Sequence, residues 1–121
     1  MTPHLNGRRI LVVEDSPGVA EASAHILGDL GCTVVGPAGS MASARSRAEA
    51  EALDAAIVDV NIRGDKIYPD LRILVLRKIP FVLTSGYAGW SMPQEWQERP
   101  RLAKPYSAAM LRESLLDLLK H

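Results

Sequence analysis

The sequence predicts an α/β domain with a doubly wound, five-stranded parallel sheet and helices on both faces. Two patterns predict this fold. Five short apolar segments alternate along the chain with segments of helical periodicity. The apolar segments are continuous runs, which is typical of strands buried on both faces of a parallel sheet. The chain has 121 residues, the usual length of one domain, and no linker composition interrupts it, so residues 1–121 are assigned to a single domain.

The predicted strands are apolar runs bounded by polar or turn-forming residues. In chain order they cover residues 8–15, 32–36, 55–60, 79–85 and 101–103. The third strand contains the run Ala56-Ile57-Val58 and ends on a lone carboxylate, Asp59. A buried strand that ends on an acid requires an explanation.

The predicted helices have apolar residues at helical spacing, and capping residues mark several of their ends. They cover about residues 17–30, 41–51, 66–78 and 88–98, and a last helix begins at residue 107. Ser16 and Pro17 suit the N-cap and the first helical position, and Gly31 suits a helix stop. Ser40 is a second N-cap, whereas the glycine and proline within 88–98 predict a short or irregular helix. The last helix has an amphipathic face made of Met110, Leu111, Leu115, Leu118 and Leu119.

Composition and charge exclude several classes of function. Fourteen basic residues balance fourteen acidic ones, so the chain has no electrostatic footprint for nucleic acid or an anionic membrane. No apolar run approaches the roughly 18 residues of a membrane span, and the N-terminus lacks the apolar core of a signal peptide. The lone cysteine, Cys32, allows no internal disulfide and is expected to be a small core residue. These features predict a cytoplasmic protein.

Polar residues gather where the predicted strands end. Glu14 and Asp15 end the first strand, Asp59 the third and Ser85 the fourth, and Lys104 follows the fifth. In doubly wound folds, ligands bind at this carboxyl edge of the sheet. Each residue alone has an ordinary explanation as a cap, a turn residue or a solvated side chain. Together, however, three carboxylates repel one another and require a positive charge, which a divalent cation and Lys104 would supply.

The residue types at this edge favour Mg²⁺ and phosphoryl chemistry. Glu14, Asp15 and Asp59 offer only oxygen ligands, which suit a hard ion such as Mg²⁺, and the scattered histidines argue against zinc. A carboxylate beside Mg²⁺ is a competent nucleophile toward a phosphoryl group and forms an aspartyl phosphate. The metal and Lys104 would neutralise charge on the transferring group, and the Ser85 hydroxyl could donate to a phosphoryl oxygen.

Four segments carry a family resemblance: ILVVEDSP (10–17), AIVDVNIRGD (56–65), IPFVLTSGY (79–87) and LAKPY (102–106). In their order and intervals they resemble the receiver domain of two-component response regulators, of the single-domain type, over essentially the whole chain. The resemblance implies a flavodoxin-like strand order 2-1-3-4-5. It also implies that Asp59 accepts a phosphoryl group from a histidine kinase or histidine phosphotransfer protein, and that the domain then changes conformation to control binding of a downstream protein.

The resemblance further implies roles for the neighbouring residues. Glu14 and Asp15 would bind Mg²⁺ directly or through water, with the backbone carbonyl of Asn61 as a further ligand. Ser85 matches the switch hydroxyl, with Thr84 as the nearby alternative. Lys104 matches the lysine that pairs with the phosphoryl group.

One position departs from the family pattern. Receivers usually carry an aromatic residue three positions before the lysine, where this chain has Arg101. The rotation of that aromatic is therefore not carried over, and Tyr106 is a candidate replacement. Because burying an unpaired guanidinium is costly, we expect Arg101 to stay at the surface and the segment from Tyr87 to Arg99 to move instead.

Two other interpretations stay open. A phosphatase-type enzyme with an aspartyl nucleophile would commonly need a second acid where this chain has Asn61. A degenerate receiver would bind partners without phosphorylation, which the intact set of Asp15, Asp59, Ser85 and Lys104 argues against. We therefore expect a signalling domain, not an enzyme, apart from its own phosphorylation and dephosphorylation chemistry. The sequence does not determine the cognate kinase, the downstream target, whether the chain stands alone or is part of a hybrid kinase, or whether it forms a homodimer.

Overall fold

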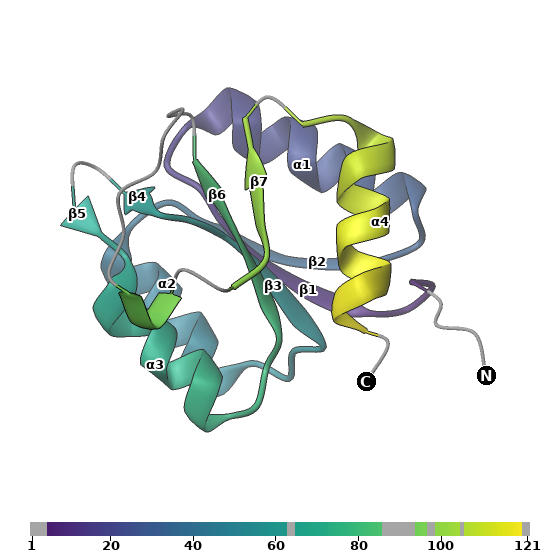
Figure 1. Cartoon of the computed structure of the whole chain (residues 1–121). Helices are drawn as coiled ribbons and strands as arrows, with labels where there is room; N and C mark the ends of the chain where they lie inside the picture. The colour runs from purple at the N-terminus through teal and green to yellow at the C-terminus, as the bar shows by residue number, and fades with distance from the viewer. Residues whose placement is uncertain (1–4, 63–64, 86–93, 97–98, 105, 120–121) are drawn as a thin grey trace.

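A computed structural model describes residues 5–62, 65–85, 94–96, 99–104 and 106–119. Strands and helices alternate along these residues (Figure 1). The strands of the main sheet are β1 (Arg9–Val13), β2 (Thr33–Ala38), β3 (Ala55–Asp59), β6 (Phe81–Ser85) and β7 (Arg101–Ala103). The helical elements are α1 (Pro17–Asp29), α2 (Met41–Ala50), α3 (Tyr68–Leu76), the single 3₁₀ turn η1 (Gln94–Trp96) and α4 (Ala108–Leu118).

The main sheet has five parallel strands in the order β2-β1-β3-β6-β7. Counted along the chain, this is the predicted order 2-1-3-4-5, so both the fold class and the strand order are confirmed. The register pairs Val13 with Val58, and Asp59 with Thr84. Because the strands are parallel, their carboxyl ends meet at one edge of the sheet.

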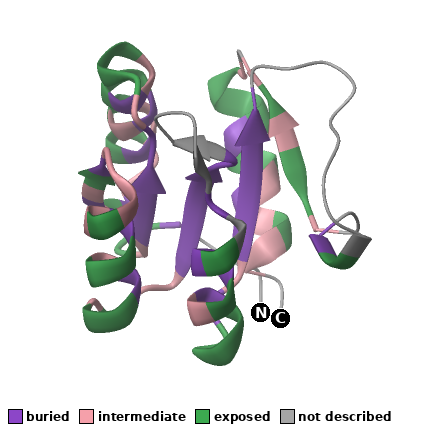
Figure 2. Ribbon diagram, turned by 90° about the vertical axis from the view of Figure 1, so that its left-hand side faces the viewer, coloured by how far each residue is buried: buried purple, intermediate pink, exposed green. Residues whose placement is uncertain are grey.

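Helices cover both faces of the sheet. Helices α1 and α4 lie on one face, and α2 and α3 lie on the other (Figure 1). The three central strands β1, β3 and β6 are buried between them, while the outer surfaces of the helices are exposed (Figure 2). Phe81 and Leu71 are fully buried under α2 and α3, and Ile10 and Leu27 under α1 and α4. Each such side chain contributes about 1.5–3 kcal/mol of burial free energy, which fixes the strand ends relative to one another.

Local signals in the sequence explain several element ends. The Ser40 hydroxyl caps α2 by accepting from the Ser43 N–H at 3.2 Å, as predicted. Gly31 follows α1 with φ +87°, a left-handed conformation, and an added Cβ there would lie 2.8 Å from Oδ1 of Asn6. Ser16 occupies the N-cap position of α1, but within the described residues its side chain makes no capping hydrogen bond. Cys32 is buried, as expected.

Three details differ from the predictions. A small antiparallel hairpin, β4 (Asn61–Ile62) and β5 (Asp65–Lys66), occupies the start of the predicted helix 66–78, and strands this short leave no periodicity to detect. Met110 is 44% exposed, because the buried face of α4 centres on Leu111 and Leu115. Of the predicted helix 88–98, η1 is described, and residues 88–93 and 97–98 lie outside the described residues. None of the described helices is both long and apolar enough to cross a membrane.

Candidate functional site

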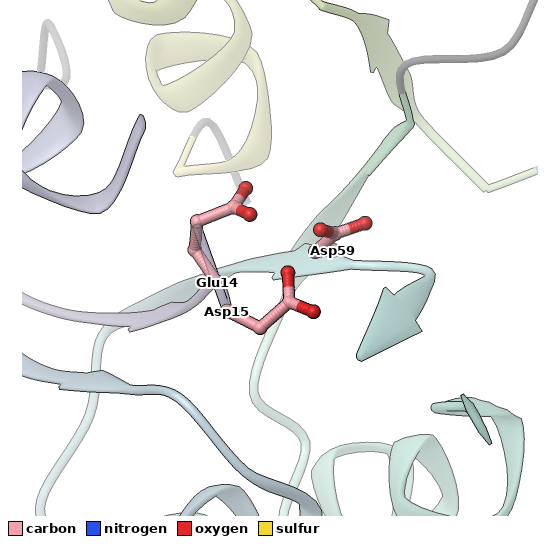
Figure 3. A group of neighbouring side chains, drawn as sticks. All are labelled: Glu14, Asp15 and Asp59. Atoms are coloured by element: carbon pink, nitrogen blue, oxygen red, sulfur yellow. The ribbon is translucent and has the colours of Figure 1, made fainter. Parts of the chain in front are cut away.

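The three predicted acids meet at the carboxyl edge of the sheet. Glu14 and Asp15 directly follow β1, and Asp59 is the last residue of the neighbouring strand β3. Their carboxylates face one shared space (Figure 3), with ligand oxygens all within 4.8 Å of one another. Glu14 and Asp59 are only 5% and 4% exposed, and Asp15 is partly exposed. Two buried carboxylates so close to a third must be balanced by positive charge.

Lys104 supplies positive charge in direct contact with two of the acids. Its Nζ lies 2.8 Å from Oδ2 of Asp59 and 2.5 Å from Oε2 of Glu14. The residue directly follows β7, and its backbone N–H donates to the carbonyl of Ser85 at 2.8 Å. The strand pairing of β6 and β7 therefore positions the lysine beside the acids.

Burial and ion pairing act in opposite directions on these groups. Burial raises the pKa of Glu14 above its usual range, because removing water disfavours the charged carboxylate, and the hydrogen bond from Lys104 offsets only part of this effect. Burial alone would lower the pKa of Lys104. Its hydrogen bonds to Asp59 and Glu14 outweigh that effect, so the pKa of Lys104 lies above its ordinary value. Lys104 is therefore a cation at all physiological pH values.

The acidic cluster has the composition of a Mg²⁺ site. All of its ligand atoms are carboxylate oxygens, and their mutual separations of at most 4.8 Å are close to the roughly 4.2 Å that two ligands on opposite sides of one Mg²⁺ would have. Among the described residues, this is the one group of three or more acids, histidines or cysteines close enough to hold a metal. Asn61, the further predicted ligand, lies in β4 two residues beyond Asp59.

Both candidate hydroxyl residues lie beside the acids. Thr84 is 1% exposed and pairs in register with Asp59, and Ser85 is 6% exposed at the end of β6. Successive side chains of a strand point to opposite faces, so the two hydroxyls do not occupy equivalent positions. Ser85 is the residue whose carbonyl binds the Lys104 backbone.

The position of the family's usual aromatic, Arg101, and the two nearest described aromatic candidates, Trp96 and Tyr106, lie in different surroundings. Arg101 is exposed on β7, as expected. Trp96 is buried, with its ring centroid 6.3 Å from that of Phe81 and the Arg99 guanidinium 5.9 Å away. Tyr106 packs on the other side of the sheet, among the side chains that α1 and α4 bury.

The sequence prediction did not include Ser23, which is 2% exposed in the middle of α1. Its Oγ lies 2.6 Å from the hydroxyl of Tyr106. A signal for this residue does exist in the sequence. Ser23 stands four residues from both Val19 and Leu27, which places a polar side chain on the apolar face of α1.

Comparison with solved structures reveals close relatives of this fold and site. The chain is similar to SdrG from Sphingomonas melonis Fr1, with 38% identity and a TM-score of 0.83 over 95% of this chain and 97% of that chain. The BeF3-activated conformation of SdrG from Pseudomonas melonis Fr1 matches with 38% identity and a TM-score of 0.79 over 92% and 95%. The third similar structure is the receiver domain of the sensor histidine kinase PA1611 from Pseudomonas aeruginosa PAO1, with a magnesium ion coordinated in its active-site cleft. It is 25% identical, with a TM-score of 0.80 over 95% of this chain and 99% of that chain.

No protein-family model and no curated protein sequence matches the chain. The structural likeness to SdrG nevertheless extends over nearly the full length of both chains, and more than a third of the aligned residues are identical. The strand order and the acidic cluster at the sheet edge agree with that likeness. The chain therefore belongs to the receiver domains of two-component response regulators, which are signalling modules rather than conventional enzymes.

Proposed function

We propose that residues 1–121 act as one receiver domain that accepts a phosphoryl group on Asp59, with Mg²⁺, from a histidine kinase or histidine phosphotransfer protein. The phosphorylated domain then changes conformation and controls the binding of a downstream protein. One observation carries the proposal: the buried Asp59 carboxylate lies against both the Lys104 ammonium and the carboxylates of Glu14 and Asp15. This arrangement combines a nucleophile, a metal-binding oxygen set and a fixed cation.

Each residue of the cluster has a defined part in the transfer. A carboxylate oxygen of Asp59 forms a bond to phosphorus, while the bond from phosphorus to the donor imidazole nitrogen breaks and the imidazole leaves. Glu14, Asp15, Asp59 and the Asn61 carbonyl would hold Mg²⁺, which would neutralise charge on the phosphoryl oxygens. Lys104 already contacts Asp59, so its ammonium needs only a short movement to pair with the new phosphoryl group.

Ser85 is proposed to respond to the phosphoryl group after transfer. Its hydroxyl donates to a phosphoryl oxygen, and the backbone bond between the Ser85 carbonyl and the Lys104 N–H makes β6 and β7 move together. The beryllofluoride-activated state of SdrG and the magnesium ion in the PA1611 receiver support the proposal of Mg²⁺-dependent phosphorylation, because both relatives share the fold of this chain.

Mass spectrometry after incubation with acetyl phosphate and Mg²⁺ tests the acceptor. We expect one added phosphoryl group in the unmodified chain and none in Asp59→Asn. Asp29→Asn, which removes an exposed acid of α1, is the matched control and should be phosphorylated normally. A labile phosphoryl group that persists in Asp59→Asn would refute the assignment.

A phosphotransfer profile against purified histidine kinases and phosphotransfer proteins tests the donor class. We expect rapid transfer from a small subset of them. Steady turnover of small phosphate monoesters, with no accumulation of the phosphorylated chain, would instead favour a phosphatase.

A further inference from the structure

A hydrogen bond between two buried hydroxyls lies close to the candidate site but has no part in the proposed transfer. Ser23 Oγ and the Tyr106 hydroxyl are 2.6 Å apart, although 83 residues separate them in sequence. Ser23 is 2% exposed, and Tyr106 is partly buried against the core under α1 and α4. Hydroxyls in such surroundings are costly to leave unpaired, so each residue depends on the other.

The pair shares its surroundings with Lys104. Ser23, Lys104 and Tyr106 together border a surface hollow of about 400 Å³, whose remaining wall is formed by small and aliphatic residues of α1. Tyr106 comes two residues after Lys104 in the chain.

The geometry links the lysine segment to the element that carries two of the acids. Helix α1 begins at Pro17, two residues after Asp15, and Ser23 lies on its buried side. The hydrogen bond between Ser23 and Tyr106 therefore fixes the segment after β7 relative to those acids. Without this hydrogen bond, two of the contacts described above would still hold Lys104. They are the ion pairs of its ammonium and the backbone hydrogen bond to Ser85. A lysine side chain has many rotamers, so a fixed backbone position limits the range over which the ammonium can move.

We propose that Ser23 and Tyr106 are positioning residues: their hydrogen bond holds the segment after β7 so that the Lys104 ammonium lies on Asp59 and Glu14 before transfer and reaches the phosphoryl group afterwards. The inference rests on the proposed function of Asp59 and Lys104. Tyr106 is thus an aromatic residue near the lysine, but it acts through the hydrogen bond of its hydroxyl to Ser23 of α1.

The first test measures affinity for beryllofluoride in the presence of Mg²⁺, because this anion imitates the phosphoryl group on an aspartate. Tyr106→Phe and Ser23→Ala each remove one hydroxyl, and we expect each to weaken binding about threefold to tenfold. The double variant should bind no more weakly than the weaker single variant, because the two hydroxyls act as one unit. Ser107→Ala is the control, since it removes the N-cap of α4 and lowers stability without touching the pair. Its affinity should equal that of the unmodified chain.

The second test asks whether the effect passes through Lys104. In a Lys104→Ala background, Tyr106→Phe should cause no further loss of beryllofluoride affinity. In the ligand-free protein, the two carboxylate partners should protect the Lys104 ammonium protons from exchange, so we expect their NMR signal to be observable. That signal should broaden in Tyr106→Phe and persist in Ser107→Ala.

Unchanged affinity and an unchanged ammonium signal in Tyr106→Phe would overturn the inference, as would an equal loss of affinity in the Lys104→Ala background. Ser23→Ala removes a core contact, so a failure of that variant to fold leaves Tyr106→Phe to decide. If the unmodified chain binds no beryllofluoride, the proposed function fails, and the ammonium signal still decides whether the pair positions Lys104.

Discussion

The Lys104 ammonium bridges two buried carboxylates, with Nζ 2.8 Å from Oδ2 of Asp59 and 2.5 Å from Oε2 of Glu14. The side chain of Lys104 is itself only 17% exposed. In the absence of a metal, this cation balances the acids whose repulsion would otherwise destabilise the sheet edge. The same ammonium is then in place for the phosphoryl group, so one residue connects the stability of the resting state with the proposed chemistry.

Replacing Lys104 should expose this dual role. Lys104→Met keeps the length of the side chain but removes the charge, and we expect it to lower the free energy of unfolding in metal-free buffer by about 2–3 kcal/mol, because two buried carboxylates lose their partner. Mg²⁺ should restore part of the loss by binding only the folded state. Urea denaturation with and without Mg²⁺ measures both effects. Arg47→Met, which removes an exposed cation, should change stability by about 0.5 kcal/mol or less. A Lys104→Met protein insensitive to Mg²⁺ contradicts the prediction.

Asp15→Asn should weaken Mg²⁺ binding about tenfold or more and slow phosphorylation by acetyl phosphate, because one of the three oxygen ligands loses its charge. The fold should remain intact, and the metal-free protein should be as stable as the unmodified one or more stable, since like charges repel. Calorimetric titration with Mg²⁺ measures the affinity. The exposed-acid variant Asp29→Asn should bind Mg²⁺ normally. Equal affinities in the two variants would place the metal site elsewhere.

Ser85→Ala should still accept a phosphoryl group at Asp59 but lose most of the structural response, because the proposed switch hydroxyl is gone. Amide chemical-shift changes on adding beryllofluoride measure that response. Thr84→Val preserves the shape of the neighbouring residue and should retain the response. The reverse result, a full response in Ser85→Ala and a lost one in Thr84→Val, would assign the switch to Thr84.

Arg101→Ala should keep the phosphorylation-dependent change in tryptophan fluorescence, because the exposed Arg101 need not rotate inward. Trp96 is a suitable reporter: it is 3% exposed, and its ring packs near Phe81. Trp90, the other tryptophan, lies outside the described residues. Arg101→Tyr, which restores the aromatic usual in the family, provides the comparison. Loss of the change in an Arg101→Ala protein that is still phosphorylated would make Arg101 part of the switch.

Alkaline pH should destabilise the protein through Tyr106. Burial raises the pKa of Tyr106 above its usual value of 10.0. The folded state therefore keeps this proton at a pH where the unfolded state loses it, so the stabilisation is complete below about pH 10 and disappears as pH rises through the folded pKa. Tyr106→Phe should remove this contribution, so the free energy of unfolding should fall less steeply with rising pH. The interval to examine is about pH 9.5 to 11, because the pKa of an ordinary tyrosine is roughly 10. Urea denaturation across that interval measures both slopes, and equal slopes would contradict the prediction.

The strands, the helices and the position of the acids could be predicted because their signals are local. Continuous apolar runs such as Ala56-Ile57-Val58 mark strands buried on both faces, and Ser40 and Gly31 mark helix ends. Parallel strands bring their carboxyl ends to one edge, so an acid at each of two strand ends already predicts a cluster. The hairpin β4-β5 escaped prediction because two-residue strands depend on pairing and not on periodicity.

By itself, the sequence determined the fold class, the edge of the sheet that holds the acids, and the oxygen-only chemistry of the candidate metal ligands. Only the tertiary structure decided that Lys104 contacts Glu14 as well as Asp59, and that Tyr106 binds Ser23. The contact between Lys104 and Glu14 and the contact between Tyr106 and Ser23 each join residues more than 80 positions apart in the sequence. Their physical origin is the parallel sheet, which brings the ends of β1, β3 and β7 to one edge, and the packing of α1 and α4 on one face of it, because local preferences fix where a helix begins but not which side chain of a distant segment will lie against it.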